Sequence, residues 1–93
     1  MNILQSYQET SIDLEKVITI STNSGGVLTA QLQDAFLYIQ DNRLKDEISF
    51  LDYLVHAKEK PTQDAIDSFF KHLFFDASLA KQFVLWQRGT KVA

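Results

Sequence analysis

The side chains most able to do chemistry are two histidines, each four residues away from an aspartate. Asp52 precedes His56, and His72 precedes Asp76. Residues i and i+4 lie on one face of a helix, so each carboxylate could orient an imidazole. If the two pairs met, their nitrogen and oxygen atoms could bind a divalent metal or support acid–base chemistry near neutral pH. Nothing in the sequence fixes their mutual register, so we predict two ordinary surface pairs and no metal site.

Signatures of covalent or phosphate chemistry are missing from the sequence. The chain has no cysteine, which excludes a disulfide, a thiolate nucleophile and a cysteine-ligated metal. Ser24 precedes Gly25 and Gly26, but no G-x-S-x-G motif surrounds a serine. Two adjacent glycines are also too few for a phosphate-binding loop. We therefore expect a protein that is not an enzyme, has no catalytic residues and needs no cofactor.

The charge distribution argues against nucleic acid as the main partner. The formal net charge is −3, and the excess lies in residues 1–44, whereas residues 45–93 are balanced. Nucleic-acid affinity comes largely from basic side chains. The alternative is a nucleic-acid-associated protein in which aromatic rings among C-terminal cations stack on bases. Its candidate residues are Lys71, Lys81, Arg88 and Lys91, interleaved with Phe75, Phe83 and Trp86.

Helices must position all of these side chains, and the strongest helical pattern is rich in phenylalanine. Four of the seven phenylalanines fall between positions 69 and 76. At about 100° per residue, one broad face collects apolar residues at the spacing of a helix lying on a core. That face carries Ile66, Phe69, Phe70, Leu73 and Phe74. Phe75 falls on the opposite side, and we expect it to turn inward at the helix end; the alternative is that it faces a partner.

Further helices are predicted over residues 30–44, over residues 46–57 and after residue 76. The candidate N-caps are Thr29 for the first helix, Thr62 for the phenylalanine-rich helix, and Asp76 or Ser78 for the last one. Gly89 is expected to end the last helix, and residues 90–93 are expected to fray. Short polar connections, including one that contains Pro61, separate these helices.

The helix over residues 46–57 is apolar on two sides. Ile48, Leu51, Leu54 and Val55 form one face, and Phe50, Tyr53 and Ala57 form another that is nearly opposite. A helix with two apolar faces is either central in the fold or part of an interface.

The first third of the chain is ambiguous. A stripe at alternating steps of four and three favours a helix, and it consists of Ile3, Tyr7, Thr10, Leu14, Val17 and Ser21. The β-branched run at residues 17–22 favours a strand instead. Residues 23–26 form a break with paired glycines, which would fit a hairpin between residues 18–22 and 27–32. We favour the helix and keep the hairpin as the alternative.

The sequence therefore predicts an all-α fold, a compact bundle of about five short helices in a single helical domain over residues 1–93. The alternative is an α+β fold with a small hairpin around residues 17–32. No apolar run reaches the length of a membrane span, and the N-terminus lacks a basic start followed by a continuous apolar stretch. We expect a cytoplasmic protein with no membrane partner.

Surplus aromatic residues favour protein binding as the function. The candidate interface residues are Phe50, Tyr53, Phe75 and Trp86. If several of them are exposed together, they form the kind of apolar patch that marks an interface; the alternative is a small core that buries them all. We expect the partner to be another protein or a second copy of this chain. A regulatory, inhibitor or adaptor role of bacterial or phage type would fit a short acidic chain.

Residues 49–81 resemble part of the YozE family of small SAM-like helical proteins. The resemblance lies in Ser49, Phe50, Tyr53, Leu54, Ile66, Phe69, Phe74, Asp76, Ser78, Leu79 and Lys81. It implies a helical bundle, and it implies no particular activity because the family has no settled one.

Overall fold

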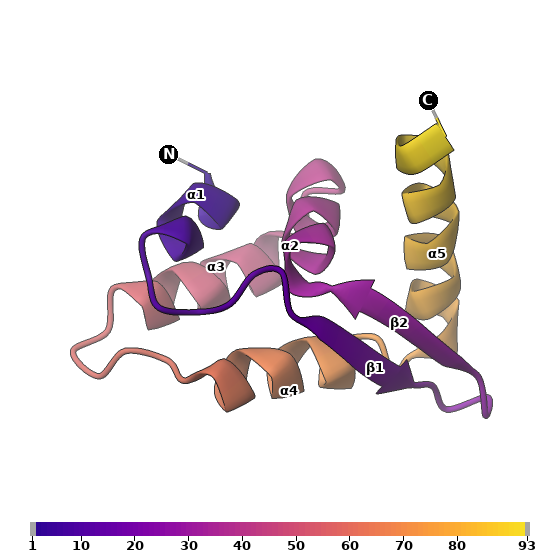
Figure 1. The fold of residues 1–93 in the computed structure, drawn as a ribbon, viewed down its shortest axis with the longest axis horizontal. Helices are drawn as coiled ribbons and strands as arrows, with labels where there is room; N and C mark the ends of the chain where they lie inside the picture. Colours follow the sequence, from indigo (N-terminus) through magenta and orange to yellow (C-terminus); the bar gives the residue numbers. More distant parts are fainter. Residues whose placement is uncertain (1, 93) are drawn as a thin grey trace.

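The computed structural model describes residues 2–92, with side chains described for residues 2–89. Within these residues, five helices pack with one antiparallel β-hairpin (Figure 1). In chain order the elements are α1 (Ile3–Gln8), β1 (Val17–Ser21), β2 (Val27–Gln31), α2 (Leu32–Asp41), α3 (Lys45–Val55), α4 (Gln63–Leu73) and α5 (Ala77–Val92). The prediction of about five helices is confirmed, and the hairpin makes the fold fit the α+β alternative better than the preferred all-α fold.

The hairpin forms where the sequence is rich in β-branched residues. Its register places Ile18 opposite Ala30 and Ile20 opposite Leu28. Burial alternates along β1 because successive side chains point to opposite faces of a strand. Gly25 has a φ of 86° in the turn, a conformation that glycine adopts without steric penalty.

The favoured helix over the first third of the chain stops at Gln8. Thr10 diverts the backbone there, since its hydroxyl donates to the Tyr7 carbonyl at 2.6 Å and accepts from the Ile12 N–H at 3.2 Å. Such local side-chain bonds compete with helical ones. Ile3 and Tyr7 are buried as the stripe predicts, but Val17, farther along the same stripe, is 59% exposed.

Helix α2 begins directly after β2, so Thr29 is not its N-cap. Thr29 lies within β2 opposite Thr19, and Gln31 occupies the cap position. The Leu32 N–H donates to the Lys16 carbonyl at 3.0 Å, which extends the hairpin ladder to the first residue of the helix. The inward face of this helix buries Leu32, Ala35, Phe36 and Ile39 at helical spacing.

The caps of the last two helices agree with prediction, whereas the predicted end of α5 does not. The Thr62 hydroxyl accepts from the Ala65 N–H at 3.1 Å, and the Asp76 carboxylate accepts from the Ser78 N–H at 2.9 Å. Helix α5 continues through Gly89 to Val92. Glycine ends a helix by adopting a positive φ, and Gly89 does not adopt one. Residues 90–92 belong to α5, and Ala93 lies outside the described residues.

A continuous aromatic core joins α1, α2, α4 and α5. Ring centroids lie 4.7 Å apart between Tyr7 and Phe36, 5.0 Å apart between Phe36 and Phe70, and 4.5 Å apart between Phe74 and Phe83. All five rings are fully buried. Each large side chain buried in this way stabilises the fold by roughly 1.5 to 3 kcal/mol, so these rings supply much of the cohesion of a chain without disulfides.

Among the described residues, no helix is both long enough and apolar enough to cross a membrane.

Candidate protein-binding surface

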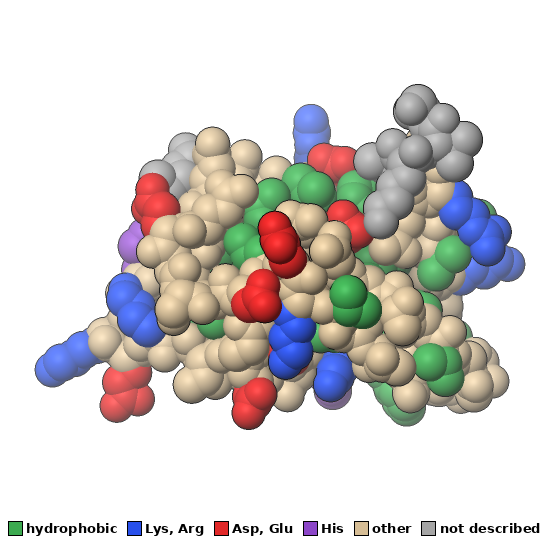
Figure 2. Space-filling view, viewed as in Figure 1, with side chains coloured by type: hydrophobic (Ala, Val, Ile, Leu, Met, Phe, Trp, Pro, Cys, Tyr) green, Lys and Arg blue, Asp and Glu red, His purple; other side chains and the backbone are tan. Residues whose placement is uncertain are grey.

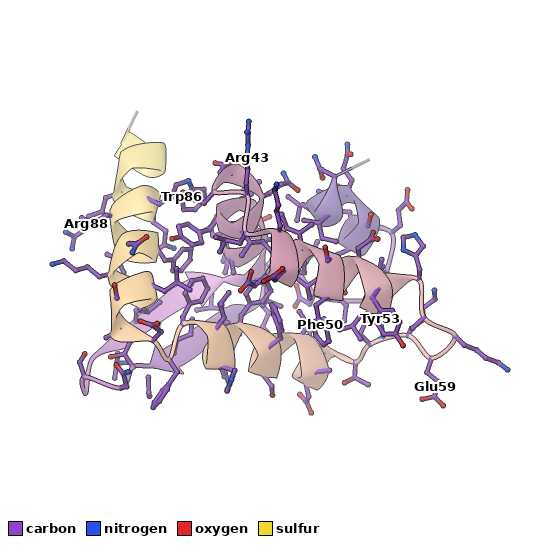
Figure 3. All side chains as sticks on the ribbon, turned by 180° about the vertical axis from the view of Figure 1, so that it is seen from behind. Arg43, Phe50, Tyr53, Glu59, Trp86 and Arg88 are labelled. Atoms are coloured by element: carbon purple, nitrogen blue, oxygen red, sulfur yellow. The ribbon has the colours of Figure 1, made fainter. Side chains whose placement is uncertain are left out.

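The outer side of α3 carries an exposed aromatic pair. Phe50 is 47% exposed and Tyr53 is 69% exposed, and the two residues lie three positions apart, so they share one helix face. The ring of Phe50 stacks on the half-buried ring of Phe69 from α4, with centroids 5.4 Å apart and planes inclined by 19°. Figure 3 shows Phe50 and Tyr53 on the α3 face nearest α4. We call Phe50, Tyr53 and Phe69 the aromatic patch.

The opposite side of α3 holds the patch in place. Leu51 and Val55 are buried there, which confirms the prediction that this helix is apolar on two sides. The phenol of Tyr7 donates to the Leu51 carbonyl at 2.8 Å and so connects α1 to the middle of α3. Burial, with a smaller contribution from the charge of Asp52, raises the pKa of Tyr7 to about 12. The phenol therefore remains a hydrogen-bond donor throughout the physiological pH range.

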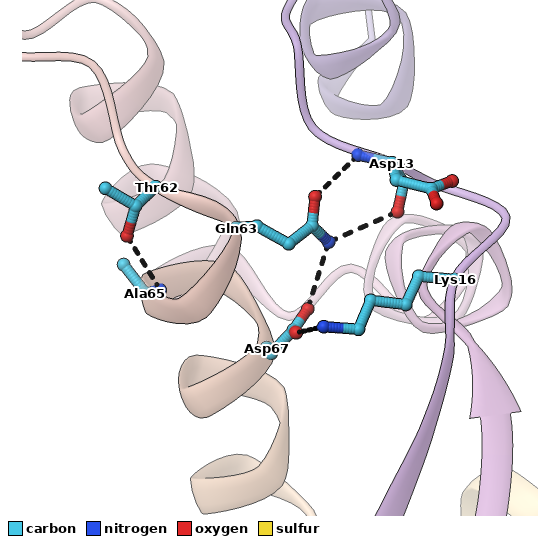
Figure 4. Close-up of polar contacts among 6 residues, drawn as sticks. All are labelled: Asp13, Lys16, Thr62, Gln63, Ala65 and Asp67. Carbon is cyan, nitrogen blue, oxygen red and sulfur yellow. Dashed lines mark hydrogen bonds and ion pairs between the residues drawn. The ribbon is translucent and has the colours of Figure 1, made fainter.

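A polar cluster fixes α4, the second support of the patch (Figure 4). The Lys16 ammonium contacts the Asp67 carboxylate at 2.5 Å, and the side chain of Asp67 is only 6% exposed. Gln63 accepts from the Asp13 N–H at 2.7 Å and donates to Asp67 at 3.1 Å. The hydrogen bond to Asp67 raises the pKa of Lys16. These contacts join the segment before β1 to the first two turns of α4.

The other two predicted interface residues lie elsewhere. Trp86 is half-buried on α5, where its indole N–H donates to Asp41 at 3.2 Å and its ring contacts Tyr38 and Phe83. It therefore lies at the rim of the core, on a different helix from Tyr53 (Figure 3).

Phe75 is 50% exposed, so the expectation that it turns inward is wrong. Its carbonyl accepts from the Asn23 N–H of the hairpin turn at 2.8 Å, and its N–H donates to the His72 carbonyl at 3.3 Å. Phe70 and Phe74 use the inward face of this helix end, and the ring of Phe75 is left outside. The structure thus brings Phe50 and Tyr53 together and places Phe75 beside the hairpin turn.

The histidine–aspartate pairs stay at the surface. His56 Nδ1 lies 3.5 Å from Asp52 Oδ1 and 2.9 Å from the Asp52 carbonyl, and both side chains are well exposed. His72 and Asp76 are exposed near the end of α4. Within residues 2–89, no three acidic or histidine side chains gather in a way that could hold a metal ion. His56 also borders a hollow of about 220 Å³, which Glu9, Thr10 and Lys60 line as well.

Of the three aromatic residues in the nucleic-acid alternative, Phe75 is exposed, Trp86 is half-buried and Phe83 is buried. Lys71, Lys81 and Arg88 are exposed, and Figure 2 shows Lys and Arg side chains on the outer side of α5. Phe83, which was to stack on bases, is fully buried. The side chain of Lys91 lies outside the described residues.

One exposed surface was missed in the sequence. Val17 and Val27 are 59% and 67% exposed at opposite ends of the outer face of the hairpin. The alternation of residues across residues 17–31 carries this information. This alternation predicts the exposed face only when residues 17–31 are taken as two strands, and the helical interpretation of residues 3–21 does not predict it.

Comparison of the chain with protein-family models, with curated protein sequences and with solved structures finds no match. The functional proposal therefore depends on the residues and their geometry alone. The resemblance of residues 49–81 to the YozE family stays a prediction.

Proposed function

We propose that this protein is a small, non-enzymatic protein-interaction module of regulatory, inhibitor or adaptor type, and that the aromatic patch is its contact surface. The observation that carries the proposal is the exposure of two neighbouring aromatic side chains, Phe50 and Tyr53, on a helix whose other face is buried. Aromatic residues are enriched in protein interfaces and dominate their energetics.

The stacked arrangement of the patch supports the same proposal. Phe69 holds the ring of Phe50 from below, so part of the patch is ordered before a partner arrives. Preorganisation lowers the entropy that association must overcome. Tyr53 offers a flat apolar ring together with a hydroxyl, which suits the edge of a contact region.

The proposed partner is another protein or a second copy of this chain, in the cytoplasm. Nucleic acid is the weaker alternative, because Phe83, one of the three aromatic residues interleaved with the cations, is buried and the net charge is −3. The cations of α5 would still allow a weak electrostatic contact.

The test is photo-crosslinking from within the patch. A photo-reactive phenylalanine analogue replaces Tyr53, and in a matched control it replaces Glu59, an exposed residue in the loop after α3 (Figure 3). We expect one discrete adduct from position 53 and none from position 59. An adduct of twice the chain mass identifies a second copy, and any other mass identifies a foreign protein.

The specificity control uses Phe50→Ser in the protein that carries the reactive group at position 53. We expect loss of the adduct with the fold retained, because the ring is already 47% exposed and its stacking contributes only about 0.5 to 1.5 kcal/mol beyond the buried area. Equal adducts from positions 53 and 59, or an adduct unchanged by Phe50→Ser, would contradict the proposal.

A further inference from the structure

The outer edge of β2 presents backbone groups that no strand pairs with. The Thr22 N–H donates to the Gly26 carbonyl at 2.8 Å, and the Leu32 N–H donates to the Lys16 carbonyl at 3.0 Å. These two bonds show which residue pairs of the hairpin are hydrogen-bonded, because hydrogen-bonded pairs alternate with non-bonded pairs in an antiparallel ladder. The register then directs the N–H and C=O groups of Val27 and Thr29 away from β1.

No other described strand pairs with these edge groups. Within the part of the chain that the structure describes, no hydrogen bond joins the backbone of Val27 or Thr29 to an element other than β1. Both side chains are exposed. Natural edge strands are commonly blunted by lysine, proline or a bulge, and the strand Val27–Gln31 contains neither residue and pairs in continuous register.

Two hollows lie beside this edge, and residues of α5 line part of both; we call the two hollows together the groove. One hollow of about 200 Å³ lies between Val27 and Leu28 on one side and Ala80, Lys81 and Val84 on the other. A second hollow of about 210 Å³ continues beside Thr29 and Ala30 and reaches Gln87. The α5 residues recur at helical spacing, so a single face of that helix lines both hollows. Figure 1 shows β2 beside the first turns of α5.

Two features select the occupant of the groove. The alternating donors and acceptors of Val27 and Thr29 repeat every second residue, a spacing that another extended backbone matches. Lys81 lies at the end of the groove near the hairpin turn, and its ammonium pairs with no carboxylate among the described side chains. A second copy of β2 would bring its own α5 to the same edge, so we take a single extended segment as the occupant.

We infer that the groove between β2 and α5 binds an extended segment of another protein, which adds as a third strand to the edge of β2 and places an acidic side chain beside Lys81. This site is separate from the aromatic patch, so either proposal can fail without the other.

The test is an NMR titration of the isotope-labelled full chain. The probes are capped peptides of alternating valine and threonine, long enough to span β2, with aspartate at one end or at the other. We expect the amide signals of Val27 and Thr29 to shift and to gain protection from hydrogen exchange with one of the two peptides. A lysine in place of the aspartate is expected to weaken binding about fivefold, because an exposed ion pair contributes modestly.

Two matched protein variants separate edge pairing from nonspecific contact. Thr29→Pro removes an outward N–H of β2 and is expected to weaken binding at least tenfold through the lost hydrogen bond and the bulk of the ring. Thr19→Pro makes the same change on the outer edge of β1 and is expected to leave binding unchanged. Lys81→Glu, at an exposed position, is expected to reverse the preference between the aspartate and lysine peptides even if a proline variant fails to fold.

The inference is overturned by any of three results. The first is an absence of shifts in β2 at millimolar peptide with the fold intact, and the second is protection at the β1 edge instead. The third is an unchanged charge preference in Lys81→Glu.

Discussion

The Lys16 ammonium lies 2.5 Å from the carboxylate of Asp67, a residue 51 positions along the chain, and this contact joins the hairpin to α4. Gln63 and Lys16 satisfy the two carboxylate oxygens separately. Because Asp67 is buried and Lys16 is half-exposed, the pair resembles an anchor at the edge of the core more than a surface ion pair.

Replacement of Asp67 by alanine should destabilise the fold by about 1 to 3 kcal/mol, since it removes a buried acceptor that holds both the Lys16 ammonium and the Gln63 amide. Asp67→Asn should have a smaller effect, because the amide can still accept from Gln63. The measurement is the free energy of unfolding from urea titration, with Asp64→Ala, an exposed change on the same helix, as control. Equal values for Asp67→Ala and Asp64→Ala would show that the anchor contributes nothing.

The buried phenol of Tyr7 should make the protein sensitive to alkali. Its pKa is raised from 10.0 to about 12, so the folded state favours the neutral phenol. The contribution of this raised pKa to the free energy of unfolding is complete below pH 10 and is lost as the pH rises toward 12. At roughly 1.4 kcal/mol per pKa unit, the loss is about 2 to 3 kcal/mol. Lys16, whose pKa is also raised, loses its contribution in the same direction above its ordinary pKa.

Unfolding followed at several pH values between neutrality and pH 12 measures this loss. Tyr7→Phe should be less stable at neutral pH, because it lacks the hydrogen bond to Leu51, but its stability should fall less at high pH. Tyr53→Phe, at an exposed ring, should keep the full alkaline loss. A parallel pH profile for Tyr7→Phe and the unmodified chain would contradict the assignment.

The hairpin turn should depend on Gly25. Its φ of 86° disfavours any residue with a Cβ atom, and Gly25→Ala should cost about 1 to 2 kcal/mol. Nothing lies within 4 Å of a Cβ atom placed there, so the penalty would come from backbone conformation alone. Gly25→Asn should recover part of it because asparagine tolerates this region. Thermal melting should rank the unmodified chain first, Gly25→Asn second and Gly25→Ala last. A Gly25→Ala variant that melts at the same temperature as the unmodified chain would disprove the dependence on Gly25.

The single tryptophan should report on the contact between α2 and α5. Asp41→Ala removes the acceptor of the Trp86 indole N–H, and we expect a shift in the emission maximum. The loss of stability should stay within about 1 kcal/mol, since the bond lies at an exposed site. Asp46→Ala, at the start of α3, serves as control and should leave the emission unchanged. Identical emission spectra for the two variants would contradict the hydrogen bond between the Trp86 indole and Asp41.

The helices could be predicted from the sequence because their signals are local. The spacing of Ile66, Phe70 and Phe74 and the cap at Thr62 lie within a few residues of one another. The two apolar faces of α3 likewise indicated Phe50 and Tyr53 as candidate interface residues, but they left open whether the two rings are exposed. The side chains of Ile3 and Tyr7 also fit their predicted stripe, so the error in the first third of the chain began only after them.

The hairpin and the position of Trp86 could not be decided from local patterns. Residues 17–22 suit both a strand and the end of a helical stripe, and the contacts that separate these states come from far along the chain. Lys16 meets Asp67, and Asn23 meets Phe75. Trp86 shows core spacing with Phe83, but its hydrogen-bond partner Asp41 is 45 residues away. Tertiary contacts of this kind override local propensity.

The distance along the chain between Lys16 and Asp67 also sets an order of events during synthesis. A growing polypeptide leaves the ribosome from its N-terminus, and β1 and β2 emerge well before α4. An isolated two-stranded hairpin is at best marginally stable in water, so until residues 63–67 follow, the early strands lack their contact with α4 and depend on α2. Between the emergence of β2 and that of residues 63–67, the nascent chain therefore exposes two uncharged strands that contain β-branched residues. We expect aggregation or chaperone capture in this interval.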